Sequence, residues 1–122
     1  MRSMSDEQLV TVRESEQAFV VAVAGEVDID VVNELHESMA RAWRANAPVT
    51  VVDLSGTEFA DSSLLNLLLE ARLRYAEQGR RLAVSGPFHP TVARLFRITG
   101  TADHLPLAST TDAAVRQAHP AP

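Results

Sequence analysis

The sequence predicts an α/β fold, a small sandwich in which single helices connect short strands. Short β-branched runs alternate with segments whose apolar residues recur at helical spacing, and glycine or proline separates many of them. A chain of 122 residues has room for one core, and its 46% hydrophobic and 22% charged residues are typical of a globular domain. We therefore expect one domain over residues 8–118, with flexible termini at residues 1–7 and 119–122.

Five short segments have the composition of strands. Residues 9–13 alternate apolar and polar side chains, which is typical of an edge strand. Two β-branched runs, residues 18–24 (AFVVAVA) and 49–54 (VTVVDL), predict strands that are buried in the sheet. Residues 81–85 predict a fourth strand, which a Gly-Pro pair ends, and residues 104–107 predict a weak fifth strand.

The first predicted helix lies between the two β-branched runs. Either Asp28 or Asp30 can serve as its N-cap, and Asn46 and Pro48 end it. We expect Trp43 to be a core or half-buried residue of this helix rather than a platform for a ligand. The helix is indicated by apolar residues at helical spacing, namely Val32, Leu35, Met39, Ala42 and Trp43.

Three further helices complete the expected fold. A leucine-rich helix covers residues 64 to about 78, with Gly79 as its C-cap. Pro90 is a natural first-turn residue and opens a helix that extends to Thr99. The last helix covers about residues 111–118. Strands that alternate with single helices in this way favour crossover connections.

The composition excludes several classes of function. The chain has no cysteine, which removes disulfides, thiol nucleophiles and thiolate-bound metals. No apolar run approaches the ~18–20 residues of a membrane span, and the start lacks the pattern of a secretory signal. We therefore expect a cytoplasmic protein without membrane insertion. The formal net charge of −5 argues against direct binding to nucleic acid, whose phosphates require a basic surface.

The leucine-rich helix begins with an informative pair of serines. Its polar residues recur every three or four positions and predict the face that lies in water. Extended back by one turn, that face reaches Ser62, whereas Ser63 is turned by about 100° toward the apolar side. Glu70 and Arg74 also have the favourable order for an i,i+4 pair. The polar stripe consists of Asn66, Glu70, Arg74 and Glu77.

Two interpretations of this helix start remain open from spacing alone. In the first, Asp61, Ser62 and Ser63 are ordinary capping residues that bind free backbone N–H groups. In the second, a serine here is a phosphoacceptor, because a helix N-terminus stabilises negative charge. A phosphate would add roughly −1.5 to −2 charges to the surface that a partner meets, without unfolding the domain.

Three motifs in this order resemble those of the STAS domain, and more narrowly those of the bacterial anti-sigma factor antagonists. They are Gly25–Asp28 (GEVD), the strand VVDL leading to Phe59–Ser63 (FADSS), and Leu95-Phe96 with Thr99-Gly100. The resemblance covers about residues 8–118. It implies a single STAS-like α/β domain with a central mixed β-sheet of about four or five strands and about four helices.

The resemblance also implies a function. In this family the unphosphorylated protein binds an anti-sigma factor, usually also a serine kinase, and the sigma factor is released. Phosphorylation of the serine after the motif aspartate ends the binding, and a serine phosphatase restores it. The match places this role on Ser62, with Ser63 as the alternative, and places Asp61 beside it and Asp28 near the kinase contact.

The position of the predicted partner surface depends on the relative direction of two strands. If the strands before Gly25 and Ser55 are parallel, the loops that follow them share one sheet edge. Acidic residues there would surround Ser62, although surface solvation and helix capping explain such acids equally well. A phosphate added among them should repel an acidic partner surface and remove a hydrogen-bond donor. The predicted partner-binding residues are Glu26, Asp28, Asp30, Glu58, Asp61, Ser62 and Asn66.

One departure from the family pattern affects the switch. The family usually has glycine where this chain has Leu64, a branched residue that narrows the backbone choices and fills space. We therefore expect a different partner specificity or slow phosphorylation. The alternative function is a STAS-type subunit of a transporter or a multi-protein sensing complex that never cycles phosphate. The oligomeric state is not determined by the sequence.

The sequence does not predict an enzyme. Ser62 lacks the G-x-S-x-G elbow of hydrolases, and single glycines form no phosphate-binding loop. We expect no cofactor and no metal, because the histidines at positions 36, 89, 104 and 119 are scattered. Val92, Leu95 and Phe96 fit a core-facing stripe of the third helix. The basic cluster Arg72, Arg74, Arg80 and Arg81 is interpreted as a solvated helix end that complements the dipole.

Overall fold

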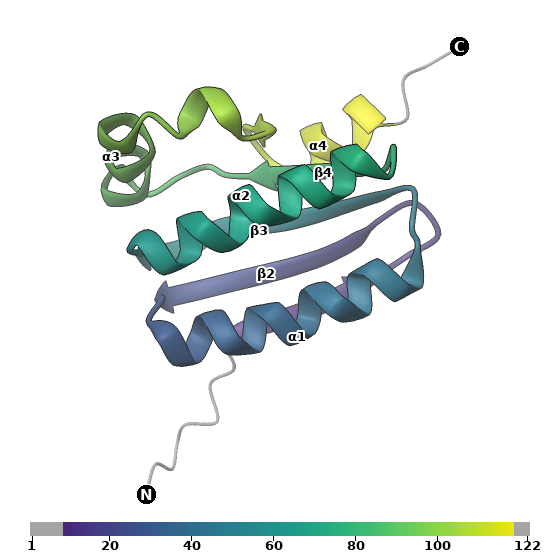
Figure 1. Cartoon of the computed structure of the whole chain (residues 1–122), viewed down its shortest axis with the longest axis horizontal. Helices are drawn as coiled ribbons and strands as arrows, with labels where there is room; N and C mark the ends of the chain where they lie inside the picture. The colour runs from purple at the N-terminus through teal and green to yellow at the C-terminus, as the bar shows by residue number, and fades with distance from the viewer. Residues whose placement is uncertain (1–8, 119–122) are drawn as a thin grey trace, which may run out of the picture.

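The structure is a computed structural model, and it describes residues 9–118. The predicted flexible termini, residues 1–7 and 119–122, lie outside the described residues, as does His119. Within residues 9–118 the strands form a single five-stranded sheet in the order β1-β2-β3-β4-β5 (Figure 1). The strands are β1 (Val10–Glu14), β2 (Phe19–Glu26), β3 (Val49–Phe59), β4 (Arg81–Ser85) and β5 (Leu107–Ala108).

The sheet is mixed, which confirms the predicted fold class. The edge strand β1 pairs with β2 antiparallel, whereas β2, β3, β4 and β5 are parallel neighbours. The parallel pairs are connected by crossovers through helices, since a parallel partner cannot be reached by a tight turn. The helices are α1 (Ile29–Ala45), α2 (Ser62–Glu77), α3 (Pro90–Thr99) and α4 (Thr111–Ala118), with a 3₁₀ helix, η2 (Ala102–His104), after α3.

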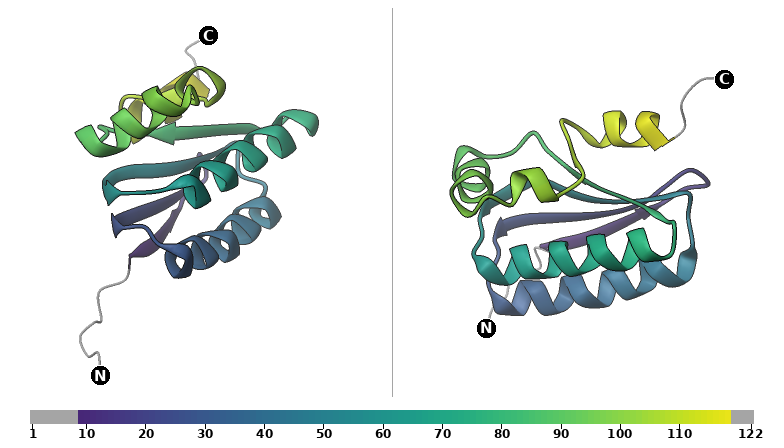
Figure 2. Two further views of the ribbon diagram at one scale, coloured as in Figure 1. Left: turned by 60° about the vertical axis from the view of Figure 1, so that its left-hand side comes forward. Right: turned by 45° about the horizontal axis from the view of Figure 1, so that its top comes forward.

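The two faces of the sheet are covered unequally. Figure 2 shows α1 and α2 side by side along one face and the short helix α4 on the other. The larger core lies under α1 and α2, where Phe19, Val21 and Val23 of β2 meet Leu35 and Leu68. A smaller core lies under α4 and consists of Ala18, Val20, Val49, Val51, Ala83, Ala108 and Ala114. Alternate residues of β2 and β3 therefore enter different cores, as the two-residue period of a strand requires.

Most predicted elements are confirmed. β4, α3 and α4 have the predicted bounds, and α3 begins with Pro90 and ends at Gly100 with φ +73°. Of the two candidate caps for α1, the structure selects Asp28. Asn46 ends α1 with φ 53°, a left-handed conformation that asparagine tolerates.

β3 is longer than predicted, because it continues past residue 54 to Phe59. The pairing with β2 shifts between Ala22↔Asp53 and Ala24↔Gly56, so an extra residue of β3 bulges from the ladder. Beyond the bulge the buried Thr57 hydroxyl donates to the Val23 carbonyl oxygen at 2.7 Å and connects the strands again. The segment SGTE has the composition of a loop, and only pairing with β2 makes it a strand.

The predicted fifth strand is present, but its predicted bounds, residues 104–107, are wrong. His104 belongs to η2, where its N–H donates to the Thr101 carbonyl oxygen at 2.9 Å, and the strand occupies only Leu107–Ala108. Pro106 has no N–H to donate to a ladder, although its carbonyl oxygen accepts from Val84 N at 2.9 Å. β2 and α2 also differ slightly from their predicted bounds, since β2 passes through Gly25 to Glu26 and α2 already begins at Ser62.

No helix in the described range 9–118 is both long and apolar enough to span a membrane.

Candidate functional site

The ends of β2 and β3 lie next to each other, at one edge of the sheet. The strands are parallel, and Glu26, the last residue of β2, is paired with Phe59, the last residue of β3. Just beyond the strand end, Val27 N donates to the Phe59 carbonyl oxygen at 2.9 Å. Helices α1 and α2 both begin at this edge, and Figure 1 shows α3 at the same end of the sheet. We call this the α1/α2 start edge.

Each helix start is capped by an aspartate. Asp28 Oδ1 accepts from Val31 N at 3.1 Å at the start of α1. Asp61 Oδ1 accepts from Ser63 N at 2.9 Å at the start of α2. The capping interpretation is therefore confirmed for the Asp61 side chain, which provides an acceptor that the first turn of α2 needs. The two serines after Asp61 are not needed as caps.

Ser62 is the first residue of α2, and its side chain is exposed. Within residues 9–118 its hydroxyl makes no hydrogen bond. Ser63 is half-buried, and its backbone N–H is occupied by Asp61. The helical periodicity thus correctly predicts that Ser62 is the more accessible hydroxyl. The next residue, Leu64, is completely buried in the larger core and contributes no surface beside Ser62.

The structure places the remaining predicted partner residues around the α1/α2 start edge. Glu26 and Glu58 lie near the ends of β2 and β3, Asp30 lies in the first turn of α1, and Asn66 lies one turn along α2. All four side chains are exposed, as are those of Asp28 and Asp61. The edge therefore presents five carboxylates and the free hydroxyl to solvent.

Two apolar residues at this edge were missed by the sequence reasoning. Ile29, the first residue of α1, is 58% exposed, and Phe59 is 51% exposed. Strand alternation would turn Phe59 inward together with Thr57. Instead a second register shift sets both Glu58 and Phe59 opposite Glu26, and both side chains lie in solvent. A large apolar residue directly after a helix cap was the only sequence signal for Ile29.

The basic cluster lies in the second half of α2 and in the segment that leads from α2 into β4. The guanidinium carbons of Arg74 and Arg80 each lie 4.1 Å from the centroid of the Trp43 ring, which packs edge-on against Tyr75. Trp43 is half-buried, as predicted. The predicted Glu70–Arg74 ion pair is not formed, because Arg74 lies over Trp43 instead. The interpretation as a solvated helix end is therefore wrong for Arg80, which is half-buried on two aromatic rings.

Two of the histidines lie on α1 and at the start of α3. His89 Nδ1 accepts from Thr91 N at 3.2 Å as the N-cap of α3, and His36 is exposed on α1. Among the residues that the structure describes, no three histidine, aspartate or glutamate side chains are grouped as metal ligands would be.

Comparison with known families defines the class of protein. Residues 10–108 match the family described as "Mlab, STAS domain". The chain belongs to the STAS domain family. No curated protein matches the sequence significantly.

Solved structures share this fold at low sequence identity. An anti-sigma factor antagonist from Mycobacterium paratuberculosis is 22% identical with a TM-score of 0.72, over 90% of this chain and 92% of that chain. The anti-sigma factor antagonist SpoIIAA in its unphosphorylated form is 18% identical with a TM-score of 0.76, over 93% and 98% of the two chains. The Bacillus cell fate determinant SpoIIAA in the phosphorylated form is 17% identical with a TM-score of 0.67, over 88% and 97%.

Proposed function

We propose that this protein is an anti-sigma factor antagonist whose binding is switched off by phosphorylation of Ser62. The observation that carries the proposal is the exposed Ser62 hydroxyl, free of hydrogen bonds within residues 9–118, at the first position of a helix that Asp61 already caps. The fold is shared with structures of anti-sigma factor antagonists, including SpoIIAA in unphosphorylated and phosphorylated forms. That likeness supports the proposed role.

The start of α2 suits a serine that gains and loses a phosphate. A dianion at the first helical position lies next to free backbone N–H groups and the positive end of the helix dipole. Because Ser62 is exposed and takes no part in the core, the added group displaces no packed side chain. The domain should therefore keep its fold in both states.

The same edge has the features of a protein-binding surface. Ile29 and Phe59 supply exposed apolar area, and the surrounding carboxylates can form a polar rim around a contact. A partner that covers Ser62 must remove water from its hydroxyl. Removing water from a phosphate dianion at the edge that also carries Ile29 and Phe59 is far more costly, and the phosphate also lacks the hydroxyl donor. Phosphorylation should therefore end binding.

The proposed partner is an anti-sigma factor with serine kinase activity, and a serine phosphatase reverses the modification. Ser62 Oγ attacks the γ-phosphorus of ATP, a new O–P bond forms, and the bond to the bridging oxygen of ADP breaks. The hydroxyl proton passes to a base of the kinase. This protein supplies the acceptor and the docking surface and carries out no catalysis of its own. The proposed place of action is the cytoplasm.

The test uses the anti-sigma kinase that co-purifies with the protein from its native host. Incubation with ATP should place one phosphate on Ser62, located by mass spectrometry, and Ser63→Ala should be phosphorylated like the wild type. Ser62→Ala should bind the kinase and resist phosphate, whereas Ser62→Asp should lose binding by about a hundredfold or more. Circular dichroism should show that Ser62→Asp is folded.

Two results would contradict the proposal. Phosphate on Ser63 would move the switch to the half-buried serine. Stable binding to a transporter or sensing assembly, with no phosphate on either serine, would favour the non-cycling STAS subunit instead.

A further inference from the structure

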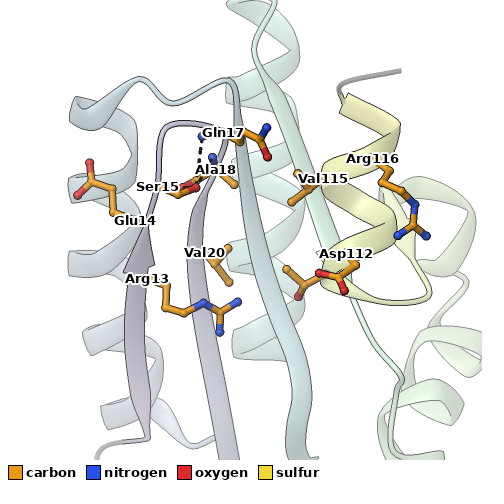
Figure 3. A pocket seen from close by; sticks show the side chains of 10 residues that line it. Arg13, Glu14, Ser15, Gln17, Ala18, Val20, Asp112, Val115 and Arg116 are labelled. Carbon is orange, nitrogen blue, oxygen red and sulfur yellow. Dashed lines mark hydrogen bonds between the residues drawn. The ribbon is translucent and has the colours of Figure 1, made fainter. Parts of the chain in front are cut away.

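The second face of the sheet contains an open groove that the α1/α2 start edge does not use. Helix α4 has only eight residues and lies mainly over β3, β4 and β5, so it does not cover β1, whose Thr11 and Arg13 are exposed on this face. Between α4 and the turn that joins β1 to β2 lies a groove of about 510 Å³ (Figure 3). This volume falls within the range of about 300–1,000 Å³ that is usual for small-molecule sites.

The floor of the groove is apolar, and the turn that forms one of its walls is held by hydrogen bonds. Ala18 and Val20 of the smaller core form the floor, and Val115 of α4 points toward it (Figure 3). In the turn, Ser15 Oγ accepts from Gln17 N at 3.3 Å and from Ala18 N at 3.2 Å. A ligand would therefore meet a wall that is already ordered, which lowers the entropy lost on binding.

The wall formed by α4 is fixed at its first residue. Thr111 Oγ1 lies 2.9 Å from Ser85 Oγ and ties the start of α4 to the end of β4. The helix therefore cannot shift toward β1 to close the groove without breaking this hydrogen bond.

Opposite charges face the floor from its two sides. Arg13 is paired with Val20 in the β1–β2 register, so its side chain lies on the same face directly beside Val20. Asp112 projects from the first turn of α4 (Figure 3). The other two charged lining residues, Glu14 and Arg116, point away from the floor. Neither the Arg13 side chain nor the Asp112 side chain makes an ion pair or a hydrogen bond with another described residue.

We propose that this groove binds a small zwitterion with an apolar side group, of the size of an apolar amino acid or a dipeptide. Its carboxylate pairs with the guanidinium of Arg13, which offers a planar fork of donors. Its ammonium group pairs with Asp112, and its side group covers Val20 and Val115. Such a ligand matches the guanidinium, the carboxylate and the apolar floor of the groove. A simple anion would instead lie near the Asp112 carboxylate with no positive group to pair with it.

The groove is separate from the proposed phosphorylation switch. It adjoins the start of β2, whereas Ser62 follows the end of β3, and because the two strands are parallel these positions lie at opposite ends of the sheet. Ligand binding and phosphorylation are therefore tested independently, and either proposal can fail alone.

The test is a titration of the whole protein with L-leucine and with leucyl-leucine, followed by amide chemical shifts in ¹⁵N-labelled protein. We expect saturable shifts at Val20 and Val115 and no shifts around Ser62. Arg13→Gln and Asp112→Asn should each weaken binding by about tenfold or more, since each removes one charge-assisted contact. Arg94→Gln removes an exposed arginine of α3 and should bind like the wild type.

Two further probes establish which charges the groove requires. Isocaproate keeps the apolar group and the carboxylate but lacks the ammonium group. N-acetyl-leucinamide keeps the apolar group and replaces both charged groups by neutral amides. Both should bind at least about tenfold more weakly than leucine. The proposal is overturned if neither leucine nor leucyl-leucine gives saturable shifts at Val20 and Val115. It is also overturned if Arg13→Gln, shown to be folded by its spectrum, binds like the wild type.

Discussion

At the scale of single residues, the accessible and the buried hydroxyls have opposite roles. Ser62 is exposed without a hydrogen bond within residues 9–118, whereas Thr57 is completely buried and donates to the Val23 carbonyl oxygen. Both lie near the end of β3, in a stretch of small polar residues. A free hydroxyl can react or bind a partner, and a buried, bonded one stabilises the irregular pairing that positions Phe59.

We predict that Thr57→Val destabilises the protein by about 1–2 kcal/mol, because the isosteric side chain leaves the Val23 carbonyl oxygen without this donor. Urea unfolding measures the loss. Thr11→Val, at an exposed position of β1, is the matched control and should change the free energy of unfolding by no more than about 0.5 kcal/mol. Equal effects of the two substitutions would show that the hydrogen bond has no special role.

Burial also determines how Leu64 can affect the site. Because it is completely buried in the larger core, it supports the start of α2 from below and does not cover Ser62. Leu64 predicts a different partner specificity or a slower phosphorylation. Either effect must therefore arise from a change in the position of α2. The kinase assay described above measures that rate.

At the scale of elements, the helix caps explain where the helices of the start edge begin. Asp28 and Asp30 are both exposed acids near the start of α1, and the sequence permits either as the cap. Only Asp28 has extended backbone geometry and accepts from the third residue along the chain, Val31. Asp30 contributes only its charge near the positive end of the helix dipole.

We therefore predict that Asp28→Ala lowers the free energy of unfolding by about 1 kcal/mol, the usual cost of losing an N-cap. Asp30→Ala, two positions away, should cost only about 0.3–0.5 kcal/mol at low ionic strength, and salt should reduce that cost further. Chemical denaturation at two salt concentrations separates the two effects. A larger loss for Asp30→Ala would contradict the assignment of the cap.

At the scale of the whole molecule, the unequal covering of the sheet predicts unequal stability. β3 lies in the middle of the sheet order, between β2 and β4, and its residues enter both cores. β5 has two residues, and in α4 only Ala114 is buried. The strands that position Ser62 thus belong to the most stable part of the fold, while the wall of the groove belongs to the least stable part.

Amide hydrogen exchange should show this difference directly. We expect the amides of β2 and β3 to exchange only by global unfolding, and those of α4 and β5 to exchange at least about tenfold faster through local opening. If the proposed zwitterion binds the groove, a saturating concentration should slow exchange in α4 more than elsewhere. Equal protection of α4 and β3 in the free protein would contradict the prediction.

The sequence by itself determined the alternation of strands and helices, the bounds of β4, α3 and α4, and the exposure of Ser62, because these depend on local period and capping chemistry. Ser62 could be distinguished from Ser63 because a helix repeats every 3.6 residues. The exposure of Phe59, the end of β3 and the choice of Asp28 were decided only by the tertiary structure. They depend on a bulge and on pairing with β2, a strand that lies about thirty residues earlier in the chain, and such contacts leave no local period in the sequence.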